Sequence, residues 1–304
     1  MIRKLFLVVT AVIIAATNGR SFAAGTADAV TSRTNVVYGT ADGQDLLMDV
    51  LFPPTDMSTS TPAPRAAIIF VHGGGWAGGD KKDFNRIATE LVGRGFVGFN
   101  VNYRLVKPNA NKWPAQIDDC QLAVRWIRAH AVQYNIDPDS LGAMGGSAGG
   151  HLVSLLGTTD TRTTESVEFP DWSSRVNCVV DLFGPSDLTE DFPTTGIIGN
   201  VQQIVENLFG KPMAEVKEIA REASPITHVA NAVPFLIFQG DKDTIVLPPQ
   251  STRFHAALQK AGKDSKLVMM KDVGHNINTM KMDEFYAECV AFYRKNLKAA
   301  GGGR

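Results

Sequence analysis

LGAMGGSAGGH, residues 141–151, is the stretch that decides the fold. An apolar, strand-like run comes first, and a helical pattern starts at Ala148. Between them stands the motif G-x-S-x-G, residues 145–149, and its place after a strand and before a helix makes it informative. The flanking glycines let the backbone turn sharply. We therefore expect Ser147 to stand above a strand end, at the positive N-terminus of a helix, as a nucleophile.

On both sides of this motif the chain alternates between strand and helix patterns. The expected strands are Ala66–Val71, Val97–Tyr103, Leu141–Gly145, Cys178–Phe183, Phe235–Gln239 and Lys266–Met270. The expected helices are Phe84–Val92, Gln116–His130, one starting at Ala148, one running through Leu258, and Asp283–Leu297. This alternation predicts an α/β fold with a mostly parallel sheet, right-handed crossovers and helices on both faces.

Two extended runs precede the alternation, Asn35–Tyr38 and Asp45–Phe52, joined around Asp42-Gly43. This pattern predicts an antiparallel hairpin at one edge of the sheet. Residues 185–228 interrupt the rhythm, contain a helical pattern near Val201–Phe209, and are expected to form a short lid-like insertion. We predict one domain over residues 34–298, preceded by a mobile leader at 24–33 and followed by a loose tail at 299–304.

The first 23 residues have the pattern of a secretory signal peptide. Arg3 and Lys4 precede an apolar run of 12 residues, Leu5–Ala16, which is too short to span a bilayer, and Ser21-Phe22-Ala23 resembles a cleavage site. An uncleaved N-terminal anchor is the alternative. We expect cleavage after Ala23, a secreted or periplasmic protein, and no stable membrane insertion afterwards.

Composition excludes several classes of protein. The 304 residues are 44% hydrophobic and 20% charged, which argues against disorder. Thirty basic residues against 31 acidic ones give no signal for nucleic-acid binding, and cleavage after residue 23 would leave 27 against 31. The mean hydropathy of −0.04 excludes a polytopic membrane protein. Cys120, Cys178 and Cys289 are far apart without metal-ligand spacing, and we expect them to be buried free thiols.

A serine nucleophile needs a base and an acid that orients the base. In this architecture the chain order is serine, acid, histidine, so among six histidines only His255 and His275 leave room for an acid-bearing strand. His255 falls inside an amphipathic helix, whereas His275 lies in a loop after the last strand, at the edge expected for Ser147. We therefore predict His275 as the base.

The acid is expected in the loop after the preceding strand, which reads Gly240-Asp241-Lys242-Asp243-Thr244. Asp243 lies deeper in this loop and is favoured, while Asp241 suits a turn-capping role. Asp264 and Asp272 flank the last strand itself and fit less well.

A developing oxyanion needs N–H donors. His72-Gly73-Gly74-Gly75-Trp76 follows an apolar strand, and its three glycines let the backbone present N–H groups to a ligand. We predict Gly74, Gly75 and Ala148 as the donors. His72 is expected to fix the loop, and Trp76 to pack or to line a pocket.

Together these blocks resemble the α/β-hydrolase superfamily. HGGGW, NYRL and GGSAGGH are similar to secreted carboxylesterases of the feruloyl/acetyl-xylan esterase type, near the hormone-sensitive-lipase-like esterases, and the similarity covers roughly residues 34–298. The resemblance implies the same three catalytic residues and the same three oxyanion donors. Hormone-sensitive-lipase-like esterases usually carry a large N-terminal helical cap, whereas a hairpin is expected at the mature start here, so we expect any lid to come from residues 185–228.

The sequence thus predicts a serine carboxylesterase that forms an acyl-enzyme and requires no metal or organic cofactor. The expected substrate is a short acyl or hydroxycinnamoyl ester, either a small molecule or linked to plant polysaccharide. A serine peptidase or amidase with the same triad, and a catalytically silent binding protein on this fold, are the alternatives. The oligomeric state does not follow from the sequence.

Overall fold

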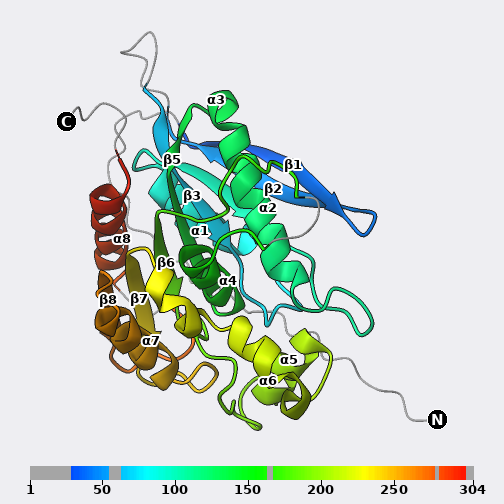
Figure 1. Cartoon of the computed structure of the whole chain (residues 1–304). Helices are drawn as coiled ribbons and strands as arrows, with labels where there is room; N and C mark the ends of the chain where they lie inside the picture. The colour runs from blue at the N-terminus through cyan, green and yellow to red at the C-terminus, as the bar shows by residue number, and fades with distance from the viewer. Residues whose placement is uncertain (1–28, 55–62, 163–166, 278–280, 299–304) are drawn as a thin grey trace.

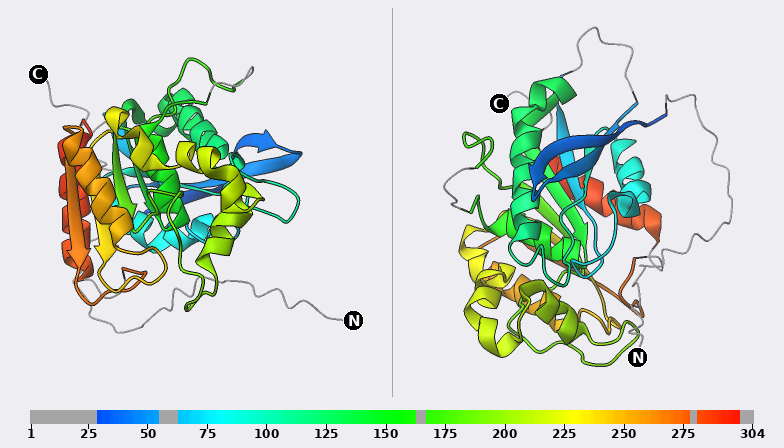
Figure 2. Two further views of the ribbon diagram at one scale, coloured as in Figure 1. Left: turned by 60° about the horizontal axis from the view of Figure 1, so that its bottom comes forward. Right: turned by 90° about the vertical axis from the view of Figure 1, so that its right-hand side faces the viewer.

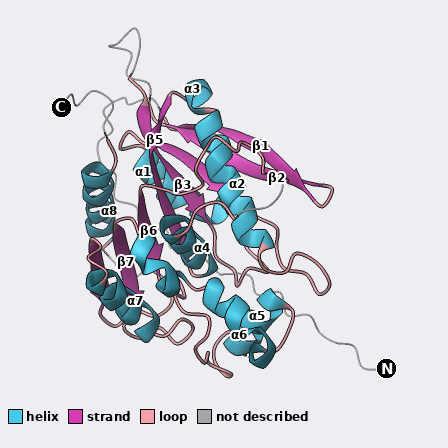
Figure 3. Cartoon of the chain, in the orientation of Figure 1, coloured by secondary structure: helices cyan, strands magenta, loops and turns pink. Residues whose placement is uncertain are grey.

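The computed structural model describes residues 29–54, 63–162, 167–277 and 281–298. In this part of the chain, eight strands form one mixed sheet in the order β1-β2-β4-β3-β5-β6-β7-β8 (Figures 1 and 3). The strands are β1 Thr31–Ala41, β2 Gln44–Phe52, β3 Arg65–Val71, β4 Val97–Val101, β5 Ile136–Gly146, β6 Cys178–Leu182, β7 Phe235–Gly240 and β8 Ser265–Met270. β2 pairs antiparallel with β1 and β4, and the remaining neighbours are parallel.

Helices cover both faces of the sheet, as the right-hand view of Figure 2 shows. The α-helices are α1 Asn85–Val92, α2 Ala115–Ala129, α3 Ala131–Tyr134, α4 Ala148–Thr158, α5 Val201–Phe209, α6 Met213–Glu222, α7 Pro249–Lys260 and α8 Met282–Asn296, and the 3-10 helices are η1 Lys81–Phe84 and η2 Pro225–Asn231. Buried side chains of α2, α4 and α7 belong to one core cluster, and those of α1 and α8 to a second one on the opposite face. Every residue of β4, β6 and β7 is buried, which explains why these strands are mostly apolar, each with a single polar side chain: Asn100, Asp181 and Gln239.

The predicted edge hairpin and the strand–helix alternation are confirmed, with shifted boundaries. β1 begins at Thr31, inside the segment predicted as a mobile leader, because its first residues pair with the end of β2. β5 starts at Ile136, five residues earlier than expected, through a polar stretch that pairs with β3 only at its first residue. The predicted signal peptide and the 299–304 tail lie outside the described residues.

The insertion at 185–228 lies between β6 and β7, as expected, and holds α5, α6 and the start of η2. Only α5 was predicted from the sequence. In Figure 1, α5 and α6 lie below the sheet, beyond the ends of the strands. The action of this segment as a lid stays a prediction.

Two further expectations concern side chains. All three cysteines are buried and free, as predicted. By its pattern, the charge run Lys81-Lys82-Asp83 would be a solvated helix start, and this is wrong for Lys81. Its side chain is 4% exposed, and its Nζ lies 3.0 Å from Asp49 Oδ1 on β2, so the ammonium group is buried against a carboxylate. Within the described residues, no helix combines the length and apolar character needed to cross a membrane.

Candidate active site

Parallel strands place four loops at one edge of the sheet. β3 ends at Val71 opposite Gly145, and β6 ends at Leu182 opposite Gly146. β7 and β8 end together at Gly240 and Met270. The loops that follow these strands, and the turn after β5, therefore meet at the carboxyl edge, where α/β sheets bind their ligands.

Ser147 occupies the sharp turn between β5 and α4. Its φ of 55° and ψ of −122° are rarely adopted by a residue with a side chain. The turn is possible because its neighbours have no Cβ: one on Gly145 would lie 2.3 Å from the Gly149 carbonyl oxygen, and one on Gly149 would lie 2.1 Å from the Val71 carbonyl oxygen. The Ser147 N–H donates to the Leu182 carbonyl at 2.9 Å, which anchors the turn on β6.

The glycine loop after β3 lies directly beside this turn. A Cβ on Gly73 would be 3.3 Å from Ser147 Cβ. Gly74 has a φ of 108° and Gly75 a φ of 58°, and the Gly74 carbonyl accepts hydrogen bonds from two later amides of the loop. In the described part of the chain, neither the Gly74 nor the Gly75 N–H donates to an acceptor. Ala148 is the first residue of α4, so its N–H has no partner within the helix either.

Asp243 and His275 are in direct contact. Asp243 Oδ2 lies 2.7 Å from His275 Nδ1, and the carboxylate is fully buried. Its Oδ1 accepts from the Ile245 and Val246 amides at 2.9 and 3.0 Å, and Gln239 Nε2 donates to Oδ2 at 3.1 Å. An ionised carboxylate only accepts, so His275 Nδ1 carries the proton and Nε2 is free to accept one.

The choice between the two loop aspartates agrees with this geometry. Asp241 Oδ1 accepts the Asp272 amide at 2.7 Å, which ties the β7 loop to the β8 loop. Asp241 therefore has the turn-capping role expected for it, and Asp243 faces the histidine.

Phe183 connects the histidine to the serine turn. Its ring centroid lies 4.5 Å from that of His275, and a Cβ on Gly146 would be 3.6 Å from its Cε2. His275 thus lies against the same phenyl ring that borders the residue before Ser147. Among the described residues, no hydrogen bond joins Ser147 Oγ to His275, a contact that often tightens only when substrate is bound.

His72 has the loop-fixing role expected of it. Its ring stacks on Tyr103 with centroids 4.4 Å apart, and the Tyr103 hydroxyl donates to the His72 carbonyl at 3.1 Å. Burial lowers the pKa of His72, so the ring is neutral.

A buried carboxyl supports the loop that carries Phe183. Asp181 on β6 is 1% exposed; its Oδ1 accepts the Gly184 amide at 2.9 Å and its Oδ2 accepts the Ser154 hydroxyl at 3.3 Å. Burial raises the pKa of Asp181 from 3.8 to about 6, and the two hydrogen bonds only partly offset this effect. At neutral pH this carboxyl is therefore charged at the expense of stability.

Asp181→Asn should change the pH dependence of stability. The pKa of Asp181 in the folded protein lies above its ordinary value, so protonation of this carboxyl stabilises the fold. That stabilisation is complete below about pH 4 and is lost as the pH rises through 6. The asparagine oxygen can still accept the Gly184 amide, and its amide nitrogen can donate to the Ser154 hydroxyl oxygen, so both contacts persist without a charge. The free energy of unfolding of the variant, relative to wild type, should rise by about 2 kcal/mol between pH 4.5 and pH 8 in urea titrations. An unchanged difference at the two pH values would contradict this assignment.

The insertion reaches the glycine loop. Ile204 of α5 is so close that a Cβ on Gly75 would lie 2.8 Å from its Cγ2. The Trp113 N–H donates to the Leu208 carbonyl of α5 at 2.9 Å, so this helix is also attached to the loop before α2. α5 therefore packs against Gly75 of the glycine loop.

Gly75→Ala should lower kcat for ester hydrolysis by about tenfold to a hundredfold, because the methyl group meets Ile204 and displaces the N–H groups of the loop. Gly262→Ala is the matched control: Gly262 also has a positive φ, 71°, but nothing lies within 4 Å of its Cβ position. Initial rates should show lost activity for Gly75→Ala only, and thermal melting should show that both variants are folded. Equal rates for both variants would refute the role of Gly75.

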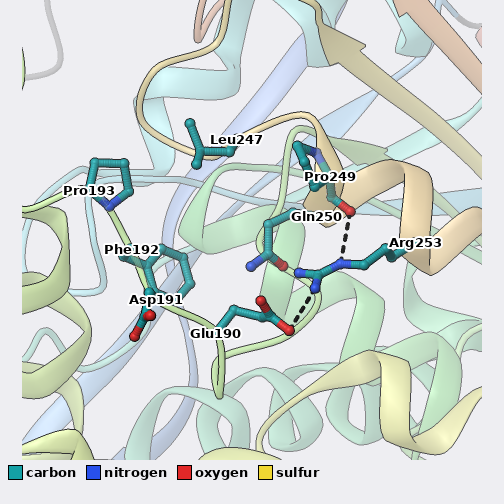
Figure 4. Close-up of a pocket in the computed structure, with 8 residues that line it drawn as sticks. All are labelled: Glu190, Asp191, Phe192, Pro193, Leu247, Pro249, Gln250 and Arg253. Atoms are coloured by element: carbon teal, nitrogen blue, oxygen red, sulfur yellow. Dashed lines mark hydrogen bonds and ion pairs between the residues drawn. The ribbon is translucent and has the colours of Figure 1, made fainter.

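A hollow of about 170 Å³ opens next to the loop after β7, which carries Asp243 (Figure 4). It lies between the 190–193 segment of the insertion and the start of α7, and is lined by Glu190, Asp191, Phe192, Pro193, Leu247, Pro249, Gln250 and Arg253. Arg253 is paired with Glu190 at 2.6 Å. None of the six predicted site residues lines it, so it is separate from the serine turn.

Comparison with known proteins agrees with this arrangement. A family model described as BD-FAE matches residues 48–258, about two thirds of the chain. The chain belongs to the BD-FAE family. Among curated proteins, this BD-FAE chain is similar to Esterase LipC from Mycobacterium tuberculosis, with 32% identity over 234 residues, 76% of the chain and 56% of LipC. It spans about half the length of the curated relatives it matches.

Two solved structures cover nearly the whole BD-FAE chain. One is a thermophilic esterase from the Planctomycetes species Thermogutta terrifontis with propionate bound, at 25% identity and a TM-score of 0.73 over 90% of this chain and 97% of the other. The second is a truncated carbohydrate esterase from gut microbiota, also at 25% identity and 0.73, over 90% and 98%. These similarities confirm the predicted α/β-hydrolase fold and the resemblance to carboxylesterases.

Sequence reasoning missed one residue of this BD-FAE site. His151 lies in α4, four residues after Ser147, is fully buried, and contacts both Trp76 and Trp113. The available signal was a histidine two residues after the G-x-S-x-G block, on a mostly apolar helix. Trp76 is 3% exposed, so packing, rather than pocket lining, describes its indole ring.

Proposed function

We propose that this protein is a secreted serine carboxylesterase in which Ser147 is the nucleophile, His275 the base and Asp243 the acid. The observation that carries the proposal is the 2.7 Å contact between Asp243 Oδ2 and His275 Nδ1, at the sheet edge where Ser147 stands in a strained strand-to-helix turn. A structural histidine–aspartate pair would not account for a strained serine turn and a glycine loop at the same edge of the sheet.

In the proposed reaction, His275 Nε2 takes the proton of Ser147 Oγ while the oxygen forms a bond to the ester carbonyl carbon. The carbonyl oxygen becomes an anion held by the N–H groups of Gly74, Gly75 and Ala148. The C–O bond to the alcohol then breaks, and the alcohol leaves with the proton from His275. Water repeats the sequence on the acyl-enzyme and releases the acid and free Ser147. The buried Asp243 carboxylate holds the tautomer of His275 and stabilises its cation.

The proposed substrates are short acyl or hydroxycinnamoyl esters, either small molecules or groups on plant polysaccharide. The names of the similar proteins support this class, since one is an esterase with bound propionate and another is a carbohydrate esterase. Ile204 of α5 lies close against Gly75 of the glycine loop, and this contact supports a preference for small acyl groups. A secreted or periplasmic location is part of the proposal and rests on the pattern of residues 1–23.

A panel of substrates tests the proposal. The purified mature protein should hydrolyse p-nitrophenyl acetate and butyrate fastest, palmitate at least about tenfold more slowly, and methyl ferulate measurably. Aminoacyl anilides matched to the same acyl groups should react far more slowly than the esters. Faster cleavage of the anilides would support the hypothesis of a serine peptidase or amidase instead. No turnover of any ester would support the hypothesis of a catalytically silent binding protein.

A further inference from the structure

His151 connects three parts of the active site. Its backbone N–H donates to the Ser147 carbonyl at 3.0 Å, in the first turn of α4. Its Nδ1 lies 3.2 Å from Trp76 Nε1, at the end of the glycine loop. Its Nε2 lies 2.7 Å from the carbonyl oxygen of Ala223, the residue that caps α6 of the insertion.

The two ring contacts fix the state of the imidazole. An indole N–H only donates and a carbonyl oxygen only accepts, so Nδ1 must be bare and Nε2 must carry the proton. A cationic ring would turn a second N–H toward the indole donor. Burial also lowers the pKa of His151 to about 4, so the ring stays neutral over the working pH range of an esterase.

Trp76 is the side-chain anchor of the oxyanion loop. Gly74, Gly75 and Trp76 have consecutive positive φ angles of 108°, 58° and 58°, an arrangement that local preferences do not hold in place. The indole meets the His151 ring edge-on, with centroids 5.3 Å apart. Without His151 Nδ1 as its acceptor, the buried Trp76 N–H would have no hydrogen-bond partner. The glycine loop would then lose the side-chain contact that holds it in place.

We propose that His151 is a positioning residue of the oxyanion hole, which couples the docking of the insertion at Ala223 to the placement of the Gly74 and Gly75 N–H groups through Trp76. This inference rests on the proposed esterase function. It predicts a loss in the stabilisation of the tetrahedral anion, with little change in the binding of the neutral ester. kcat should therefore fall while KM stays nearly constant.

Three variants test the coupling in the full-length mature protein. His151→Leu removes both ring hydrogen bonds at similar volume. Trp76→Phe keeps an aromatic ring but removes the N–H donor together with part of the buried indole volume. Each should lower kcat for p-nitrophenyl butyrate by about tenfold to a hundredfold, with KM within about threefold. His151→Gln should restore most of kcat, because its amide has an oxygen to accept and an N–H to donate. The double variant His151→Leu/Trp76→Phe should be no slower than the slower single variant.

His130→Leu is the matched control. His130 also contacts a tryptophan, since its ring stacks on Trp126 with centroids 4.0 Å apart. It lies at the end of α2, away from the glycine loop, so its replacement should leave kcat unchanged. Trp76→Phe keeps the test decisive if His151→Leu does not fold. Wild-type kcat in Trp76→Phe, or equal losses in His151→Gln and His151→Leu, would overturn the positioning role and leave the esterase proposal intact. Absence of ester hydrolysis in the wild-type protein would overturn both.

Discussion

Asp243→Asn should lower kcat for ester hydrolysis by about a thousandfold to ten thousandfold, with the fold retained. Asparagine keeps an oxygen for the Ile245 and Val246 amides, so the loop itself stays in place. Its amide nitrogen then faces His275 Nδ1, which must give up its proton and accept. The proton moves to Nε2, and His275 can no longer deprotonate Ser147.

Asp241→Asn is the control for this variant, since it lies in the same loop two residues earlier. Its side-chain oxygen continues to accept the Asp272 amide, and kcat should stay within a few-fold of wild type. Steady-state rates on p-nitrophenyl butyrate, with circular dichroism to check the fold, decide between them. A large loss for Asp241→Asn with normal activity in Asp243→Asn would reverse the assignment of the acid.

Ser147→Ala should reduce hydrolysis at least about ten thousandfold, to a rate set only by the oxyanion donors and substrate binding. The hydroxyl makes no hydrogen bond in the described structure, so its removal should not lower the melting temperature by more than a few degrees. Ser140→Ala provides the comparison at the other end of the same strand, where the hydroxyl donates to Asp137 at 2.9 Å. Ser140→Ala should keep its activity. Hydrolysis by Ser147→Ala at the wild-type rate would exclude Ser147 as the nucleophile.

The order of elements and the site loops were predictable because they depend on local patterns and on one topological rule. Strands buried on both faces are continuous apolar runs, and parallel strands bring their following loops to one edge. That rule was enough to pair His275 with Asp243 across 32 residues and to assign Asp241 to a turn.

What the sequence did not predict depends on contacts between distant segments. Lys81 looked like part of a solvated charge run, because nothing near it indicates Asp49 on a neighbouring strand. His151 looked like an ordinary residue of a buried helix, since its partners come from positions 76 and 223. α6 was missed because it is a short helix, MAEVKEIARE, that buries only Val216 and Ala220.

The central claim is that Ser147 is made nucleophilic by His275. Labelling with a fluorophosphonate probe, followed by peptide mass spectrometry, tests this claim most directly. Wild-type protein should carry one adduct, on the peptide containing Ser147, and His275→Gln should label at least about a hundredfold more slowly under the same conditions. Absence of an adduct on Ser147 in wild-type protein that still hydrolyses esters, or an equal labelling rate in His275→Gln, would contradict the account.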